Sequence, residues 1–289
     1  MNALKKFIRT GSLLSLFTTM LLLLSLSPTK LLAHEPIFGL GPNTIFKGGF
    51  GIETKYEKEL LTGVDEPERT TSFRAEIMYG VTGDLAVTLS VPTIFGYTKR
   101  DSEGSRSGIG DISFRTKYRF WRDDKPGVQD AAAVIIGIKL PTGDYENTPA
   151  LGSGSTDYLF ALAAARASRR WYYFGNVRYR LNTKGNTIQF GNLFLADAAF
   201  GVRPWLTEYL KPDLVVMVEL NWESRQRSKT EGQIMANSGG DRLFLSPGIF
   251  LTLRNWAIKG GVQIPLWQKM NGSQRETDYR YALAIEVHV

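Results

Sequence analysis

Charged and aromatic side chains alternate in residues 110–121, GDISFRTKYRFW. Successive side chains of an extended strand point to opposite faces, so Arg115, Lys117 and Arg119 share one face and Phe114 and Tyr118 the other. Three cations along one wall can form ion pairs with facing carboxylates, or they can attract anions. Which of the two occurs depends on whether the charged face meets bulk water or an enclosed interior.

The same alternation places charged residues on the polar face of several other segments. The residues that we expect on one shared inner face are Arg74, Glu76, Asp111, Arg115, Lys117, Arg119, Asp157, Arg178, Arg180, Glu219, Glu223, Arg280 and Glu286. This set suits two roles, namely charge pairs that brace a narrow interior and a polar constriction that selects solutes.

Arg115, Lys117 and Arg119, together with Arg178 and Arg180, make a local basic excess on this face. In an open lumen such an excess favours anionic solutes, because rings of charge set pore selectivity. Replacing Arg115 and Arg178 together by Glu would then reverse the anion preference.

Groups for catalysis are sparse. The chain has two histidines and no cysteine, which excludes disulfides and thiolate zinc sites. A Ser-His-acid hydrolase needs a histidine beside a serine, but His34 lies near the N-terminus and His288 at the chain end. The glycine-rich run 152–157 lacks the lysine and the helix of a phosphate loop. We expect neither an enzyme nor a cofactor.

A metal site at the N-terminus is a separate alternative. Cleavage after Ala33 would leave His34 with a free amine and an imidazole, a donor pair for a metal such as copper. His288 lies at the end of the last predicted strand, which would close against the first, so the two histidines could meet at one metal ion. Two histidines are few ligands for a metal ion. The simpler interpretation is that His34 lies in a solvated N-terminal segment and that His288 lies at the end of the last strand without binding metal.

Twelve segments have period two or continuous β-type hydrophobicity, which predicts strands. They cover residues 48–58, 71–80, 84–95, 109–121, 131–141, 156–167, 170–181, 192–203, 213–223, 241–253, 255–267 and 277–289. Globular strands average about 5 to 6 residues, whereas a tilted transmembrane strand needs about 9 to 11. The lengths favour an all-β fold, a single closed antiparallel transmembrane β-barrel of twelve strands. Ten or fourteen strands stay open, because residues 131–141 and 155–167 alternate poorly.

The connections between these segments tend to alternate between short and long. Residues 81–83 and 168–169 form tight reversals, whereas residues 142–155 are rich in Gly, Ser and charge. Outer-membrane barrels have short periplasmic turns and longer outer loops, so the pattern predicts two periplasmic termini. Residues 122–130 and 204–212 are exceptions, because they are long where short turns are expected.

All six tryptophans lie at or just beyond a segment end. They are Trp121, Trp171, Trp205, Trp222, Trp256 and Trp267. An indole ring is stable where its apolar body is buried and its N–H is hydrated, so these positions predict aromatic girdles at the two membrane interfaces.

A soluble two-sheet sandwich would show the same alternation, with its apolar faces packed together. The first 33 residues argue against that alternative. Lys5, Lys6 and Arg9 precede an apolar run over residues 13–26, as in a cleaved secretory signal peptide. Its removal takes four basic residues and lowers the formal net charge from +7 to +3, so nothing points to nucleic acid.

Several motifs resemble an outer-membrane family named after the MetA pathway of phenol degradation. They are GDI at 110–112, KYR at 117–119, IKLPTGD at 138–144, LGSGSTD at 151–157 and NVRY at 176–179. The resemblance implies a β-barrel that admits small, often hydrophobic or aromatic, compounds. The chain departs from the usual pattern of outer-membrane proteins by ending in Val289 rather than an aromatic residue, although the apolar alternation of its last segment is kept.

We therefore expect a signal peptide at 1–33, an irregular N-terminal arm at 34–47 and one barrel domain at 48–289 of the bacterial outer membrane. The expected function is a porin-like channel for passive passage of small molecules, hydrophobic, aromatic or anionic. The alternative is a barrel that binds a ligand or a metal ion at His34 without conducting. The expected partners are membrane lipid, small solutes and the barrel assembly machinery. Whether the arm plugs the lumen is left open by the sequence.

Overall fold

The structure is a computed structural model that describes residues 35–63, 67–98, 105–146, 149–207 and 211–289. The predicted signal peptide and His34 lie outside the described residues. No helix in the described part of the chain is long and apolar enough to cross a membrane.

Strands dominate the described residues. They are β1 (Phe50–Thr62), β2 (Glu68–Gly80), β3 (Leu85–Thr98), β4 (Ser105–Ile109), β5 (Ser113–Lys125), β6 (Val128–Lys139), β7 (Asp157–Ser168), β8 (Trp171–Leu181), β9 (Ile188–Gln189), β10 (Leu193–Val202), β11 (Asp213–Arg225), β12 (Lys229–Thr230), β13 (Gln233–Ile234), β14 (Gly240–Leu253), β15 (Trp256–Met270) and β16 (Glu276–His288).

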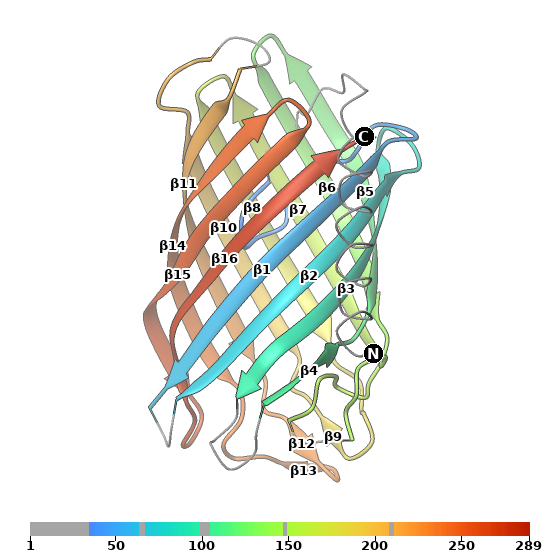
Figure 1. The fold of residues 1–289 in the computed structure, drawn as a ribbon, viewed down its shortest axis with the longest axis vertical. Helices are drawn as coiled ribbons and strands as arrows, with labels where there is room; N and C mark the ends of the chain where they lie inside the picture. The colour runs from blue at the N-terminus through green and yellow to red at the C-terminus, as the bar shows by residue number, and fades with distance from the viewer. Residues whose placement is uncertain (1–34, 64–66, 99–104, 147–148, 208–210) are drawn as a thin grey trace, which may run out of the picture.

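The long strands form one antiparallel sheet that closes on itself (Figure 1). Each pairs with its neighbours along the chain, and the last strand β16 pairs with the first, β1, from Gly51↔His288 to Thr62↔Glu276. The short strand β4 pairs only with the end of β3, while β5 pairs with its earlier part. Twelve long strands therefore enclose the barrel, and the predicted fold and strand number are confirmed. Closure leaves no unpaired edge to face lipid.

The two ends of the barrel differ. Tight turns and the C-terminus lie at one end, which we name the turn end, at the top of Figure 1. Longer connections lie at the opposite end, the loop end, where β9, β12 and β13 form a small separate sheet.

The prediction of a long connection at residues 122–130 is wrong. Strand β5 continues to Lys125 and β6 begins at Val128, so the turn consists of Pro126 and Gly127, with Gly127 at φ +76°. Cross-strand pairs Asp123↔Asp130 and Asp124↔Gln129 extend the hairpin, although their polarity resembled that of a loop. The second exception, residues 203–212, is a long connection between β10 and β11.

The prediction of one continuous strand from residue 109 to residue 121 is also wrong at its start. Residues 110–112 leave the regular ladder between β4 and β5, although Gly110 N–H still donates to Pro92 O at 2.8 Å. The pairs Ser90↔Ser113 and Thr93↔Ile109 show one extra residue on this side, which is a β-bulge.

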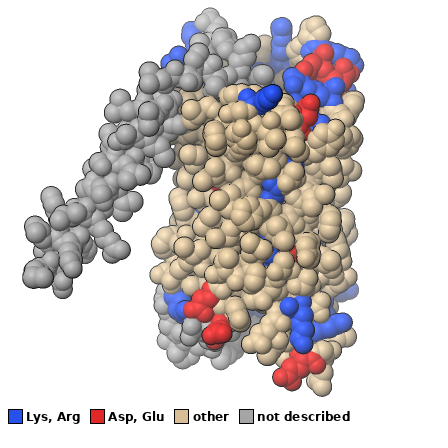
Figure 2. Space-filling model, turned by 90° about the vertical axis from the view of Figure 1, so that its right-hand side faces the viewer, with Lys and Arg blue, Asp and Glu red and all other residues tan. Residues whose placement is uncertain are grey.

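The outer wall is apolar over a broad band, with charge gathered at both ends (Figure 2). Its side chains are the apolar members of each alternating strand, such as Phe114, Leu162, Leu220 and Leu283, each about half exposed. An exposed apolar band of this extent is stable only in lipid.

We predict that an arginine on this band destabilises the barrel according to depth. Leu162 lies in the middle of β7, whereas Leu253 ends β14 at the turn end. Leu162→Arg should lower the free energy of unfolding by about 2 to 4 kcal/mol and Leu253→Arg by at most about 1 kcal/mol. Urea unfolding in phospholipid vesicles measures both, and equal effects would contradict the assignment of this face to lipid.

Candidate functional site

Residues 35–47, named the arm, fold into the barrel interior. The arm contains no strand, as predicted. It enters at the turn end, where Thr44 Oγ1 donates to Gly83 O at 2.7 Å. Glu35 and the carbonyl of Asn43 both meet the Lys117 ammonium, at 2.6 and 2.9 Å, so the segment between them forms a loop across the lumen.

The tip of this loop is held by one carboxylate. Glu219 on β11 is fully buried and accepts the backbone N–H groups of Ile37 at 2.6 Å, Phe38 at 3.3 Å and Gly39 at 3.3 Å. From the facing wall, Lys55 Nζ on β1 donates to Ile37 O at 2.9 Å. Hydrogen bonds that involve charged groups contribute about 1.5 to 3 kcal/mol each, so these contacts define the position of the tip.

Two glycines of the barrel wall leave space for the tip of the arm. A Cβ at Gly248 would clash with Ile37 Cδ1, and one at Gly261 would lie 3.0 Å from the Phe38 ring. Gly248 and Gly261 are directly paired across β14 and β15, which makes one shallow seat for Ile37.

The other side of the arm packs against mostly small side chains of β6 and β7. Leu40 packs against Ile135, Ala161 and Ala163. The poor alternation of these two segments therefore reflects inward alanines that leave room for the arm.

Part of the interior towards the turn end is apolar. An enclosed cluster lies there on β8, β10, β11, β14 and β15, and its buried members are Tyr172, Phe174, Ala199, Val215, Met217, Phe250 and Ala257. The inner face is therefore not uniformly charged, as alternation alone suggests.

The predicted inner-face residues project into this interior, and most meet an opposite charge. Arg115 pairs with Glu76, Lys117 with Glu35, Arg119 with Asp84, Arg178 with Asp197, and Arg280 with Glu223 and Glu59. Glu286 pairs with Lys259 at 3.4 Å, and Arg74 with Glu57 at 3.2 Å. Arg119 lies apart from the rest at the turn end. Ion pairs that brace the interior thus account for most of the predicted inner-face residues.

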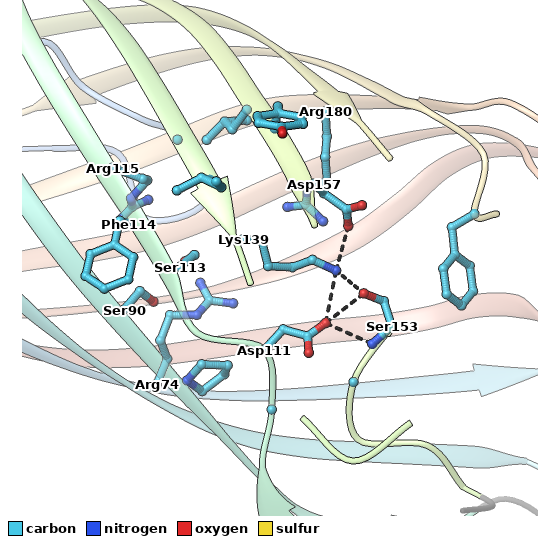
Figure 3. A pocket seen from close by; sticks show the side chains of 18 of the residues that line it. Arg74, Ser90, Asp111, Ser113, Phe114, Arg115, Lys139, Ser153, Asp157 and Arg180 are labelled. Carbon is cyan, nitrogen blue, oxygen red and sulfur yellow. Dashed lines mark hydrogen bonds and ion pairs between the residues drawn. The ribbon is translucent and has the colours of Figure 1, made fainter. Parts of the chain in front are cut away.

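Two cavities lie on the loop side of the arm, with volumes of about 390 and 310 Å³. Arg74 and Arg180 line both. In the larger cavity, Figure 3 shows their side chains reaching into the same space. Arg180 has no hydrogen-bond or ion-pair partner among the described residues, which distinguishes it from the other cations of this cavity.

A cluster at the loop end explains the motifs of the sequence. Lys139 Nζ lies 3.0 Å from Asp111 Oδ2 and 2.6 Å from Asp157 Oδ2, and it also contacts Ser153 Oγ (Figure 3). Ser153 donates its N–H and its hydroxyl to Asp111, both at 2.8 Å. The bulge before β5 places Asp111 where it can fasten the connection between β6 and β7. The motifs thus build a loop anchor.

Asp111 is ionised in this anchor. Burial raises the pKa of its carboxyl, but hydrogen bonds from Ser153 and Lys139 outweigh burial and lower the pKa below its ordinary value. Sequence reasoning named Asp111 and Asp157 but missed Lys139 and Ser153. Lys139 could have been found, because it lies within the IKLPTGD motif on the inner face.

The structure gives no support for metal binding by His288. Its Nε2 lies 2.6 Å from Glu286 Oε1, inside the wall. The described residues contain no group of three or more His, Cys, Asp or Glu that could hold a metal ion. His34, the predicted metal ligand, lies outside the described residues.

The tryptophans lie at two levels of the outer wall. Trp121, Trp171, Trp205 and Trp256 are near the turn end, and Trp222 and Trp267 are near the loop end. All except Trp256 are more than 40% exposed. The prediction of girdles is consistent with these positions.

Comparison with known proteins identifies the family. Residues 35–269 match the family described as "Putative MetA-pathway of phenol degradation". The chain belongs to this family. The match begins with the first described residue of the arm and ends in β15, so it covers the arm and most of the barrel wall. No curated protein matches the chain.

The solved structures that match the chain are distant in sequence. The COG4313 outer membrane channel from Pseudomonas putida F1 is 11% identical, with a TM-score of 0.68 over 89% of this chain and 100% of that chain. The β-domain of the Bordetella autotransporter BrkA is 10% identical, with a TM-score of 0.49 over 83% of this chain and 99% of that chain. The first match supports the fold, an outer-membrane β-barrel, as the strand lengths predict.

We predict that Glu219→Gln loosens the arm. Glutamine keeps one acceptor oxygen but turns an amide donor toward N–H groups that need acceptors. Amide hydrogen exchange of residues 37–39 should accelerate at least about tenfold, while exchange of β11 stays unchanged. Glu223→Gln on the same strand, which faces Arg280 instead, is the control. Equal exchange at the tip in all proteins would contradict this role of Glu219.

We predict that the loop anchor is lost only at low pH. The folded pKa of Asp111 lies below its unfolded value of about 3.9, so its stabilisation is present above that pH and is lost as pH falls through the folded pKa. Hydrogen exchange, corrected for its intrinsic pH dependence, should leave residues 149–156 protected from pH 7 to about 4. Asp111→Asn should expose them throughout. A wild-type transition near neutral pH would refute this assignment.

Proposed function

We propose that the protein is a channel of the bacterial outer membrane for small molecules, in which the arm closes the passage. The observation that carries this proposal is the arm itself. It crosses an enclosed, charged interior, and the contacts that hold its tip are hydrogen bonds and apolar packing. Segments held in this way can leave and return without breaking the barrel, because the strand ladder does not include them.

The proposed orientation places both termini in the periplasm. Short turns share the end of the C-terminus, and longer loops with their small sheet lie at the other end, as in outer-membrane barrels. Solutes would then reach the two loop-side cavities first and meet the arm next. The barrel assembly machinery is the proposed partner during insertion.

The proposed solutes are small, and anions are favoured. Four of the five basic residues that suggested this preference are neutralised by carboxylates, so the preference rests on Arg180. We propose passage without catalysis, since the described histidine is engaged with Glu286 at the strand end.

A barrel that binds a ligand without conducting is the second candidate. The packing of the arm against three walls favours it, because a tightly held arm leaves no continuous path. Conductance of the intact protein in planar bilayers separates the two candidates.

We predict that Ile37→Glu opens the channel. The substitution places a second carboxylate beside buried Glu219 and removes the side chain that fills the seat at Gly248. Unitary conductance or open time in planar bilayers should rise several-fold over the parent. Phe46→Glu, which changes an exposed arm residue at the turn end, should behave as the parent. Identical currents from all three would show that the arm is not the barrier, and no current from any would favour the binding barrel.

A further inference from the structure

We propose that the larger loop-side cavity is a binding site for a small organic monocarboxylate, with Arg180 as the group that binds the carboxylate. The ligand class is one negative charge on an apolar body about the size of a benzene ring. This inference rests on the proposed function, since it names the solute that the channel would select.

One of the cations that line the cavity makes no direct ion pair with a described residue. Four cations line it, Arg74, Arg115, Lys139 and Arg180, against the three carboxylates Glu76, Asp111 and Asp157. Glu76 is engaged by Arg115, and both aspartates by Lys139. Arg74 reaches Glu57 outside this cavity, at 3.2 Å.

Arg180 is left with no described partner and with unfavourable neighbours. The guanidinium groups of Arg225, Arg178 and Arg74 oppose its charge, while the Asp157 carboxylate, which makes no direct ion pair with it, favours that charge. Arg180 is exposed to the space of the cavity, so an anion can reach it, and neighbouring cations repel each other. A bound anion relieves that repulsion, and a guanidinium accepts a carboxylate through two parallel hydrogen bonds.

A single charge suits the site better than two. Asp157 is 3% exposed and lines the same cavity, so a dianion would gain little beyond its first charge and would be repelled by this carboxylate. A monoanion pairs with the one guanidinium of the cavity that makes no direct ion pair.

The rest of the cavity wall selects an apolar body. Pro92, Ile94, Leu151 and Leu159 line it beside the charged groups. Leu159 is the cross-strand partner of Arg180, so an apolar surface adjoins the guanidinium directly. The volume of about 390 Å³ exceeds the roughly 30 Å³ share of one water more than tenfold, which leaves room for a ring.

Arg180 also lines the second cavity, which the arm residue Phe38 borders. A carboxylate that binds Arg180 would therefore lie between the loop end and the arm. The residue is placed to determine specificity before the arm is reached.

Calorimetric titration of the folded chain in detergent tests the site without requiring conduction. The probe is sodium benzoate, with benzyl alcohol as the uncharged analogue and inorganic phosphate as the anion without an apolar body. Benzoate should bind to the wild-type protein, and benzyl alcohol and phosphate should each bind at least about tenfold more weakly than benzoate.

Arg180→Gln should weaken benzoate binding at least about tenfold, and Arg180→Lys should weaken it less, because the charge remains. Arg225→Gln is the matched control, since it removes the same charge from the same wall but lines neither cavity. It should change affinity by less than about threefold.

Equal losses in Arg180→Gln and Arg225→Gln would overturn the site in favour of a general field of positive charge. Phosphate binding as tight as benzoate would overturn the monocarboxylate class. Absence of benzoate binding to the wild type would refute the inference while leaving conduction intact. Benzoate binding by a protein that carries no current would instead refute the channel and leave this site standing.

Discussion

Closure of the sheet between β1 and β16 is the constraint on which the rest of the structure depends. In lipid an unpaired backbone group costs several kcal/mol, so the ladder from Gly51↔His288 to Thr62↔Glu276 must be complete. A closed wall necessarily encloses the polar face of each strand. Charges that would be solvated on an open sheet must then find partners inside, as Lys259 does with Glu53 and Glu286.

The enclosed interior is divided by the arm into two regions of different chemistry. An apolar cluster around Phe174 and Val215 fills part of the turn-end side, and the charged cavities occupy the loop side. The arm is fastened where these regions meet, through the buried carboxylate of Glu219. The same residue would be costly if the arm left, because its charge would lose three donors. In the proposed channel the closed state is favoured for this reason, and opening would have to offer Glu219 water or another donor.

The family motifs have a structural role in addition to lining the larger cavity. Asp111, Lys139, Ser153 and Asp157 fasten the connection between β6 and β7 to the wall, and this connection carries Leu151 into the larger cavity. Arg180 lies outside these motifs, although Arg178 lies within one. A shared anchor with a separate contact residue would let related barrels keep one architecture and accept different solutes.

The sequence by itself determined the barrel and favoured twelve strands, with ten or fourteen left open. It also indicated which side chains face inward, because period two is a property of each strand alone. It also placed the tryptophans near both rims. It misjudged residues 122–130, whose polar residues resemble a loop although they pair across the hairpin of β5 and β6.

Only the tertiary structure decided which charges pair and what fills the lumen. Arg178 pairs with Asp197 on another strand, and Glu219 accepts a hydrogen bond from Ile37, which lies far away in the chain. The lack of a direct partner for Arg180 likewise depends on which side chains surround it in the cavity. Alternation assigns each residue a face, but distances across the lumen follow from barrel closure and from the path of the arm. These are properties of the whole chain, and no local pattern contains them.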